Sequence, residues 1–244
     1  KITCCSNVIK LPLFLNNNYD LSNLERLDCS NSKIKYIPKE LTKLKELNCS
    51  SCDYLENIPN ELINLEILIC NNTEFKTIPD TLLNLKELKC YSGELIEIPA
   101  TLLKLIKIDI SGLQLNYLPK TLVNLEVLNF STTDLEFIPK EFIKLTDLDC
   151  SYTEIESIPE ELINLKELDC SDTRISKIPS TLFKLTDLDC SNTLVTHIPK
   201  ELINIVRLYY DTDENVEDIL INITKRKIKV VNGFHKYIKL YMNY

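Results

Sequence analysis

Cysteines are the first residues whose type and spacing could support chemistry in this chain. Seven of the ten cysteines recur at multiples of about 20 residues, and Cys49-Ser-Ser-Cys52 forms a C-x-x-C motif. Such a motif can provide a redox couple or half of a zinc site. However, both of its cysteines occupy ordinary repeat positions, and the sequence holds no second C-x-x-C. We therefore expect no metal site, no redox site and no cofactor.

Acidic residues recur with the same period. The stretches Asp147-Leu148-Asp149, Glu167-Leu168-Asp169 and Asp187-Leu188-Asp189 each place two acids around a leucine. In a strand, the acids would point to one face and the leucine to the other. Three stacked strands would then form a grid of six carboxylates, with Tyr152 and Asp172 beside it and Lys166 as the nearest basic residue. The grid is open to three interpretations: a solvated face, a docking surface for a basic peptide or protein, or a calcium site, for which the sequence shows no suitable D-x-D loop.

Other residues argue against catalysis. The chain has only two histidines, His197 and His235, and its three glycines are isolated from one another. A nucleophile elbow and a phosphate-binding loop both need closely spaced glycines. We expect no catalytic residues and no enzyme activity. A smaller apolar patch, made of Ile67, Ile69 and Tyr91, is a second candidate contact surface.

The strands and turns that position these residues are predicted from a regular spacing of prolines. Nine prolines from Pro38 to Pro199 stand 20 residues apart after a first step of 21. A fixed period of this length indicates a small structural unit that repeats and stacks. Within each unit, L-x-x-L-x-C alternates with period two and predicts a short strand, and the Ile-Pro step predicts an extended return. The predicted strands are centred on Leu27, Leu47, Leu68, Leu88, Ile108, Leu128, Leu148, Leu168, Leu188 and Leu208.

The cysteine column is interpreted as part of the core. Ile110 and Phe130 replace cysteine at the same repeat position, so the position selects an apolar group. Free cysteine behaves as a small hydrophobe, and parallel inward side chains suit disulfide geometry poorly. Reduced core thiols favour a reducing, intracellular compartment.

One repeat, residues 165–184, reads L-K-E-L-D-C-S-D-T-R-I-S-K-I-P-S-T-L-F-K. It resembles the leucine-rich repeat, L-x-x-L-x-L-x-x-N-x-L, in the 20-residue form of bacterial secretion effectors. The Cys-Ser-x-Thr stretch resembles more closely the repeats of uncharacterised proteins from amoeba-infecting giant viruses. The resemblance covers about residues 20–212. It implies an α/β-type solenoid, a horseshoe with a concave parallel sheet of about ten short strands, an irregular or extended convex side and capped ends.

The chain ends depart from the repeat. We expect a degenerate N-terminal repeat or cap with a convex insertion at residues 1–20, repeats at 21–212, and a C-terminal cap with a basic tail at 213–244. Within the last part, residues 213–222 predict a helix, residues 228–231 a strand, and Phe234, Tyr237, Ile238 and Tyr241 fit one helical face, with alternation left open.

Charge is divided unevenly. Residues 225–244 carry six basic residues and no acid, which leaves 22 basic and 36 acidic residues elsewhere, a balance of −14. Nucleic acid is therefore excluded from the acidic face, and no apolar run is long enough to span a bilayer. The favoured function is a protein-interaction scaffold that binds an unknown, basic protein partner on its concave face. The alternative is a structural or packaging protein that self-associates through acidic face and basic cap.

Overall fold

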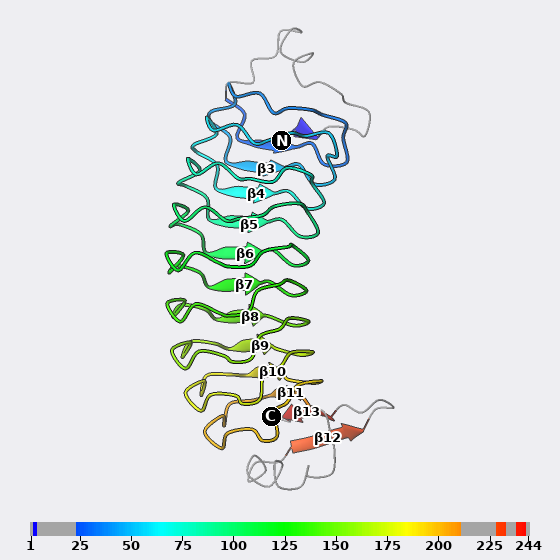
Figure 1. Ribbon diagram of the computed structural model, residues 1–244, viewed down its shortest axis with the longest axis vertical. Coiled ribbons are helices and arrows are strands. Elements are labelled where there is room, and N and C mark those ends of the chain that lie inside the picture. Colours follow the sequence, from blue (N-terminus) through cyan, green and yellow to red (C-terminus); the bar gives the residue numbers. More distant parts are fainter. Residues whose placement is uncertain (1, 4–22, 211–227, 233–237, 243–244) are drawn as a thin grey trace. The chain divides into compact units, whose positions relative to one another are not determined.

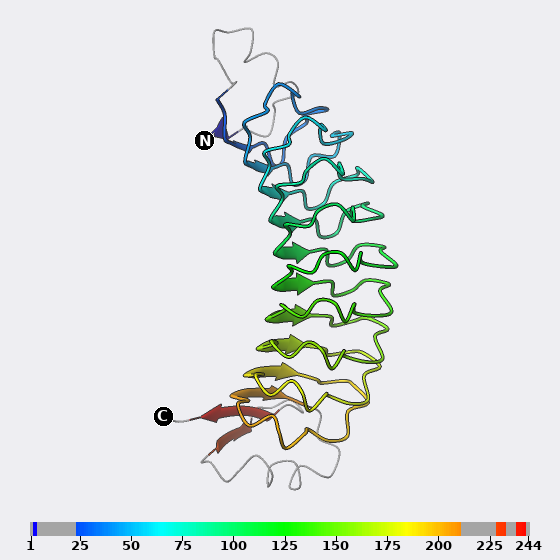
Figure 2. The same cartoon turned by 90° about the vertical axis from the view of Figure 1, so that its left-hand side faces the viewer.

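The computed structural model of the protein describes residues 2–3, 23–210, 228–232 and 238–242. The chain forms two compact units, residues 1–125 and 126–244. In each unit, short parallel strands line one side, and turns and extended segments run along the other (Figures 1 and 2). Within the described residues the chain forms strands, turns and extended segments and no helix, which agrees with the expected irregular return side.

Each unit holds one run of parallel strands that pair in chain order. In the first unit they are β1 (Ile2–Thr3), β2 (Arg26–Asp28), β3 (Glu46–Asn48), β4 (Ile67–Ile69), β5 (Glu87–Lys89) and β6 (Lys107–Asp109). In the second they are β7 (Val127–Asn129), β8 (Asp147–Asp149), β9 (Glu167–Asp169), β10 (Asp187–Asp189) and β11 (Arg207–Tyr209). The ten predicted strands are all confirmed with their predicted central residues, and β1 pairs with β2 as a further strand.

The C-terminal region contains an antiparallel pair, β12 (Ile228–Asn232) and β13 (Ile238–Met242). The predicted strand at 228–231 is confirmed. The helical interpretation is wrong at Ile238–Met242, where apolar and polar residues alternate and the two-residue period of a strand prevails. The predicted helix at 213–222 lies outside the described residues. Because residues 4–22 and 211–227 also lie outside them, the division into caps and repeats stays a prediction.

The core of each unit is built from the inward side of the repeat. The central leucine or isoleucine of each strand from β2 to β11 is at most 4% exposed. A buried cysteine outside any disulfide follows β2, β3, β4, β5, β8, β9 and β10, and Ile110 and Phe130 are buried at the same position after β6 and β7. The apolar nature of this position is therefore confirmed. Burial, with smaller effects from neighbouring Cys150 and Cys190, raises the pKa of the Cys170 thiol well above its usual value.

Threonine side chains close the turn after five strands, β4, β7, β8, β9 and β10. The Thr173 hydroxyl donates to the Cys170 carbonyl at 2.7 Å and accepts from the Ile175 N–H at 3.5 Å. Thr73, Thr133, Thr153 and Thr193 donate to the carbonyl three residues earlier in the same way. Each of these bonds satisfies a carbonyl at the end of a buried strand, where an unpaired acceptor would destabilise the fold. The strand ends, and the side chains on them, are thereby fixed in position.

Candidate functional site

Six carboxylates lie on one face of the second unit, on the outward side of β8, β9 and β10. The register pairs Asp147 with Glu167 and Asp149 with Asp169, and it continues from these to Asp187 and Asp189. The leucines between them are buried. Neighbouring strands are about 4.8 Å apart, so the predicted grid of carboxylates is present. We call it the acidic face: Asp147, Asp149, Glu167, Asp169, Asp187 and Asp189.

The acidic face lines a shallow hollow of about 420 Å³. Val127 and Asn129 of β7 lie at one end of the lining, and Arg207 and Tyr209 of β11 lie at the other. The hollow is thus bounded by uncharged residues on one side and by a cation and an aromatic ring on the other. This arrangement gives the face a defined extent along the row of strands.

The column of Asp149, Asp169 and Asp189 has a structural role that the sequence did not reveal. Asp169 Oδ1 accepts hydrogen bonds from the Ser171 N–H at 3.0 Å and the Ser171 hydroxyl at 2.6 Å. Asp149 and Asp189 accept the same pair of bonds from their serines. In other repeats Asn48 and Asn129 accept them through an amide oxygen. The turn therefore requires an acceptor oxygen and does not require a negative charge.

Substitution of Asp169 separates these two roles. Asp169→Ala removes both bonds to Ser171, so we expect the free energy of unfolding to fall by about 1–2 kcal/mol. Asp169→Asn keeps the acceptor, as Asn129 does in its own turn, and should leave the stability unchanged or slightly higher. Urea unfolding followed by circular dichroism measures both variants. Equal stability of the two variants would contradict the structural role.

The second column of the acidic face is formed by Asp147, Glu167 and Asp187. Its carboxylates make other contacts than the turn bonds of the first column. The Thr146 hydroxyl donates to Asp147, and the Thr186 hydroxyl donates to Asp187 at 2.7 Å. Arg207 forms an ion pair with Asp187 from the neighbouring strand. Arg207, and not the sequence-predicted Lys166, is therefore the cation shown to contact the acidic face. The sequence did not point to Arg207 and Tyr209 as site residues. However, they flank Leu208 in a strand that was predicted, and pairing of that strand with β10 would have placed them beside the acidic face.

The charge of this face reaches the core below it. Burial raises the pKa of the Cys150 thiol, and the carboxylates of Asp149 and Asp169 add to that rise. The corresponding face of the first unit differs, because it carries charges of both signs and four of them form ion pairs: Arg26 with Glu46 at 3.0 Å, and Lys89 with Glu87 at 3.0 Å. The described structure therefore concentrates unbalanced negative charge on the face of the second unit.

Tyr152 and Asp172 lie in the turns directly after β8 and β9, beside the acidic face. Both have left-handed backbones, with φ of 55° and 54°. This conformation costs about 1–2 kcal/mol for an ordinary residue, and glycine and asparagine tolerate it best. Tyr152 is nevertheless 61% exposed, so its ring gains little from burial. The same position holds Asn31, Asn72, Gly112 and Asn192 in four other repeats, and Ser51, Ser92 and Thr132 in three more.

The second candidate surface, Ile67, Ile69 and Tyr91, is brought together only in part. Ile67 and Ile69 both point outward from β4 and line a small hollow of about 170 Å³. Tyr91 lies in the turn after β5, where it is 39% exposed and its N–H donates to Asn71 Oδ1 at 3.2 Å. It does not line that hollow, and its membership of the apolar patch stays a prediction.

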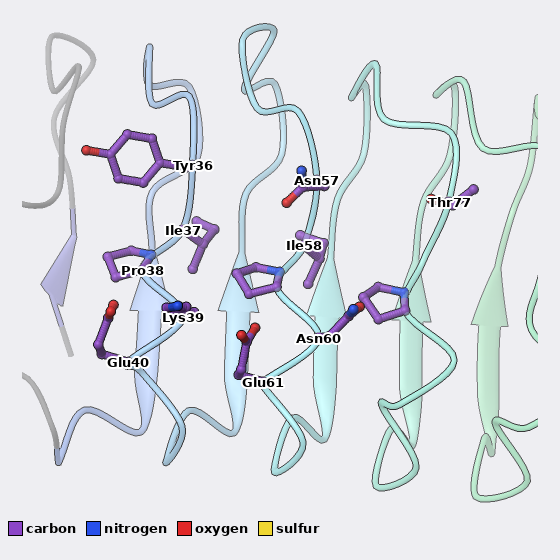
Figure 3. Close-up of a pocket in the computed structure, with 12 residues that line it drawn as sticks. Tyr36, Ile37, Pro38, Lys39, Glu40, Asn57, Ile58, Asn60, Glu61 and Thr77 are labelled. Atoms are coloured by element: carbon purple, nitrogen blue, oxygen red, sulfur yellow. The ribbon is translucent and has the colours of Figure 1, made fainter.

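A larger hollow of about 730 Å³ lies on the return side of the first unit (Figure 3). Tyr36, Pro38 and Pro59 line it together with both Lys39 and Glu61. Charges of both signs line this hollow, so it has no preference for a charged ligand. No sequence pattern marks its residues as a site. Among the described residues, no group of three or more His, Cys, Asp or Glu side chains could hold a metal ion. In the same part of the chain, no helix has the length and apolarity to cross a membrane.

Comparison with known proteins shows which solved structures this architecture resembles. The leucine-rich-repeat family model matches residues 164–185, and no curated protein matches the chain. The solved structure of the Listeria monocytogenes internalin InlF is 21% identical, with a TM-score of 0.68, over 80% of this chain and 63% of that one. Listeria InlJ, described as including a cysteine ladder, is 24% identical, with a TM-score of 0.72, over 85% and 49%. The ectodomain of the Arabidopsis thaliana receptor kinase GASSHO1/SCHENGEN3, solved in complex with CASPARIAN STRIP INTEGRITY FACTOR 2, is 28% identical, with a TM-score of 0.66, over 83% and 28%.

The chain spans less than two thirds of the length of each of these proteins. Below 25% identity the likeness to the internalins concerns the fold alone, but the fold is specific. A repeat of about 20 residues, one short parallel strand per repeat and a buried leucine ladder are shared features of one architecture. The repeat, the family match at residues 164–185 and the solved structures together show that this chain has the fold of leucine-rich-repeat proteins.

Proposed function

We propose that this protein is a non-enzymatic interaction scaffold whose acidic face binds a basic segment of a protein partner. Leucine-rich-repeat solenoids typically present extended surfaces to protein partners. The observation that carries the proposal is the register of six carboxylates on three adjacent strands, around a hollow that they line. Like charges on neighbouring strands repel each other, so this arrangement reduces stability unless a partner neutralises it.

The turn geometry strengthens the proposal. Asn48 and Asn129 make the same turn bonds as Asp149, Asp169 and Asp189. Local structure therefore explains an acceptor at these three positions and does not require their charge, although Asp28 and Asp109 make the same turn bonds outside the acidic face. What distinguishes the acidic face is that three such aspartates are adjacent and that each strand carries a second acid. Tyr152 adds a second such feature, because an exposed tyrosine in a left-handed turn is less stable than the asparagine of other repeats. Tyrosine is also enriched where proteins contact each other.

A lysine-rich peptide of about twelve residues is the probe for this proposal, with a glutamate-rich peptide as its control. We expect fluorescence anisotropy to show binding of the lysine-rich peptide alone at about 50 mM salt. The affinity should fall at least roughly tenfold at 300 mM salt, because exposed charges are screened. Affinity capture from a native lysate, with the same salt series, then identifies the natural partner.

The decisive variant is the triple substitution Asp149→Asn, Asp169→Asn and Asp189→Asn. It removes three charges and keeps the turn bonds, so the melting temperature should rise while peptide affinity falls at least about tenfold. The matched control is Asp28→Asn with Asp109→Asn, since both aspartates make the same turn bonds in the first unit. Unchanged affinity in the triple variant would leave a solvated face and withdraw the site. Tyr152→Asn should also raise the melting temperature and weaken binding of the captured partner.

A further inference from the structure

One cation of the chain already lies on the acidic face. Arg207 is the first residue of β11, and the parallel register places it opposite Asp187 of β10 (Figure 1). Its Nε donates to Asp187 Oδ1. Arg207 also lines the hollow of about 420 Å³ that the six carboxylates line. A guanidinium from outside the three acidic strands therefore occupies a carboxylate that a basic partner could otherwise contact.

Both carboxylate oxygens of Asp187 accept bonds from within the chain. Oδ1 accepts from Arg207, and Oδ2 accepts from the Thr186 hydroxyl at 2.7 Å. The Asp187 side chain is only 19% exposed. A second cation at this carboxylate would lie close to the Arg207 guanidinium, and like charges repel each other. A cation of the partner can therefore pair fully with Asp187 only after Arg207 has moved away.

The other two carboxylates of the same column carry no such cation. Asp147 accepts from the Thr146 hydroxyl, and Glu167 is exposed on β9. Within residues 23–210, the ion pairs of the structure involve neither of these two side chains. Arg207 thus neutralises one end of the column, while Asp147 and Glu167 keep unpaired charge for a partner.

The pair between Arg207 and Asp187 can be exchanged without loss of the fold. The Arg207 side chain is 50% exposed, and ion pairs that solvent reaches contribute little to stability. The strongest arginine–carboxylate pairs use both carboxylate oxygens in a fork, whereas here one of the two oxygens accepts from Thr186. The neighbouring Leu208 is 4% exposed and holds β11 in place through the core.

We infer that Arg207 is an internal ligand of the acidic face, which a basic partner displaces from Asp187 when it binds. This inference rests on the function proposed above and adds its regulation. Basic side chains that meet Asp147 and Glu167 bind without competition, and they supply the binding free energy that displacement of Arg207 requires. The competition therefore favours segments with several cations over a single cation.

Arg207→Gln tests the inference with the lysine-rich peptide as probe. The variant removes the competing cation, so we expect fluorescence anisotropy to show an affinity about three- to fivefold higher than that of the wild type at about 50 mM salt. The matched control is Arg26→Gln, because Arg26 forms the equivalent pair with Glu46 in the first unit. Its affinity should equal that of the wild type. Lys166→Gln removes a positive charge one residue before β9 and should raise the affinity by less than Arg207→Gln does.

A double-mutant cycle separates displacement from a general effect of charge. In an Asp187→Asn chain, Arg207 has lost the carboxylate that holds it on the face. Adding Arg207→Gln to that chain should therefore raise the affinity by less than it does in the wild type. Equal gains in the two backgrounds would mean that Arg207 acts only through its charge at a distance, and they would overturn the inference.

Nuclear magnetic resonance of the arginine Nε–H groups observes the displacement directly. The chain has only four arginines, so the spectrum of Arg207→Gln identifies the Arg207 signal by its absence. Titration of the wild type with the lysine-rich peptide should move this signal towards the position of a free arginine side chain. The Arg26 signal should stay in place. An Arg207 signal that does not move while the peptide binds would overturn the inference.

The affinity results also distinguish this inference from the proposed function. A wild type that binds the peptide, with equal or weaker binding by Arg207→Gln, would overturn the inference and keep the acidic face as a binding site. Binding by Arg207→Gln alone would support the inference as a complete block. No binding by either chain would overturn the proposed function and the inference together. If Arg207→Gln does not fold, as judged by circular dichroism, Arg207→Met replaces it, because methionine keeps part of the apolar stem.

Discussion

Raising the pH from about 7.5 to 9.5 is expected to lower the free energy of unfolding by roughly 4 kcal/mol. Burial raises the pKa of Cys49, Cys70, Cys150 and Cys170 well above their usual value. These thiols stay protonated in the folded chain, whereas in the unfolded chain they ionise near pH 8.5. The stability that they contribute is therefore present below about pH 8.5 and is lost above it, by about 1.4 kcal/mol for each thiol over this interval. Cys52 opposes them by about the same amount as one thiol, because its hydrogen bond with Cys29 lowers its pKa to about 6.

Urea unfolding at the two pH values, with a phosphine reductant present, measures this effect. The matched variant is Cys150→Val with Cys170→Val, because Ile110 shows that the position accepts a branched aliphatic side chain. Two of the four thiols with raised pKa are then absent, so about two thirds of the net pH dependence should disappear. An identical pH dependence in the wild type and the double variant would show that other groups cause it.

The fold could be predicted from the sequence because one local pattern is repeated. Leu148, Leu168 and Leu188 each lie between two outward residues, and a period of 20 residues fixes which strands become neighbours. A strand placed in another register would not stack on the strands on either side of it. Every repeat therefore predicts the same register. The C-terminal strand Ile238–Met242 lies outside that constraint. There a short apolar stretch fits a helical or a strand period almost equally well.

The residues of the acidic face, and the side of the strands on which they lie, could be predicted from the sequence. The structural role of these residues could not. Alternation about Leu168 is enough to place Glu167 and Asp169 outward. It does not show that Asp169 closes the following turn through Ser171, because that depends on the backbone after the strand. The left-handed backbone at Tyr152 was equally hidden, since tyrosine carries no signal for it. The sequence alone also does not separate the exposed Ile163 and Phe183 from the buried Leu162 and Leu182 that precede them, because all four are apolar.

Phe142→Ala is expected to lower the free energy of unfolding by about 3–5 kcal/mol, since it removes most of a fully buried ring. Phe142 begins the turn before β8, and the Leu145 N–H donates to its carbonyl at 3.1 Å. Leu122, Leu162 and Leu182 fill the same position in other repeats and are equally buried. Phe142→Leu should therefore cost only about 1 kcal/mol, as a change that the repeat already accommodates.

Both variants are compared by urea unfolding and by binding of the lysine-rich peptide under conditions where each is folded. The alanine variant should expose the amides of β8 to faster hydrogen exchange, because its cavity lies directly before that strand. Peptide affinity of the folded fraction should stay within about twofold of the wild type, since all six carboxylates remain. Equal losses of stability in the two variants would mean that the core around Phe142 adapts to either side chain. Loss of affinity in the leucine variant would mean that the position of β8, and not only its charge, determines binding at the acidic face.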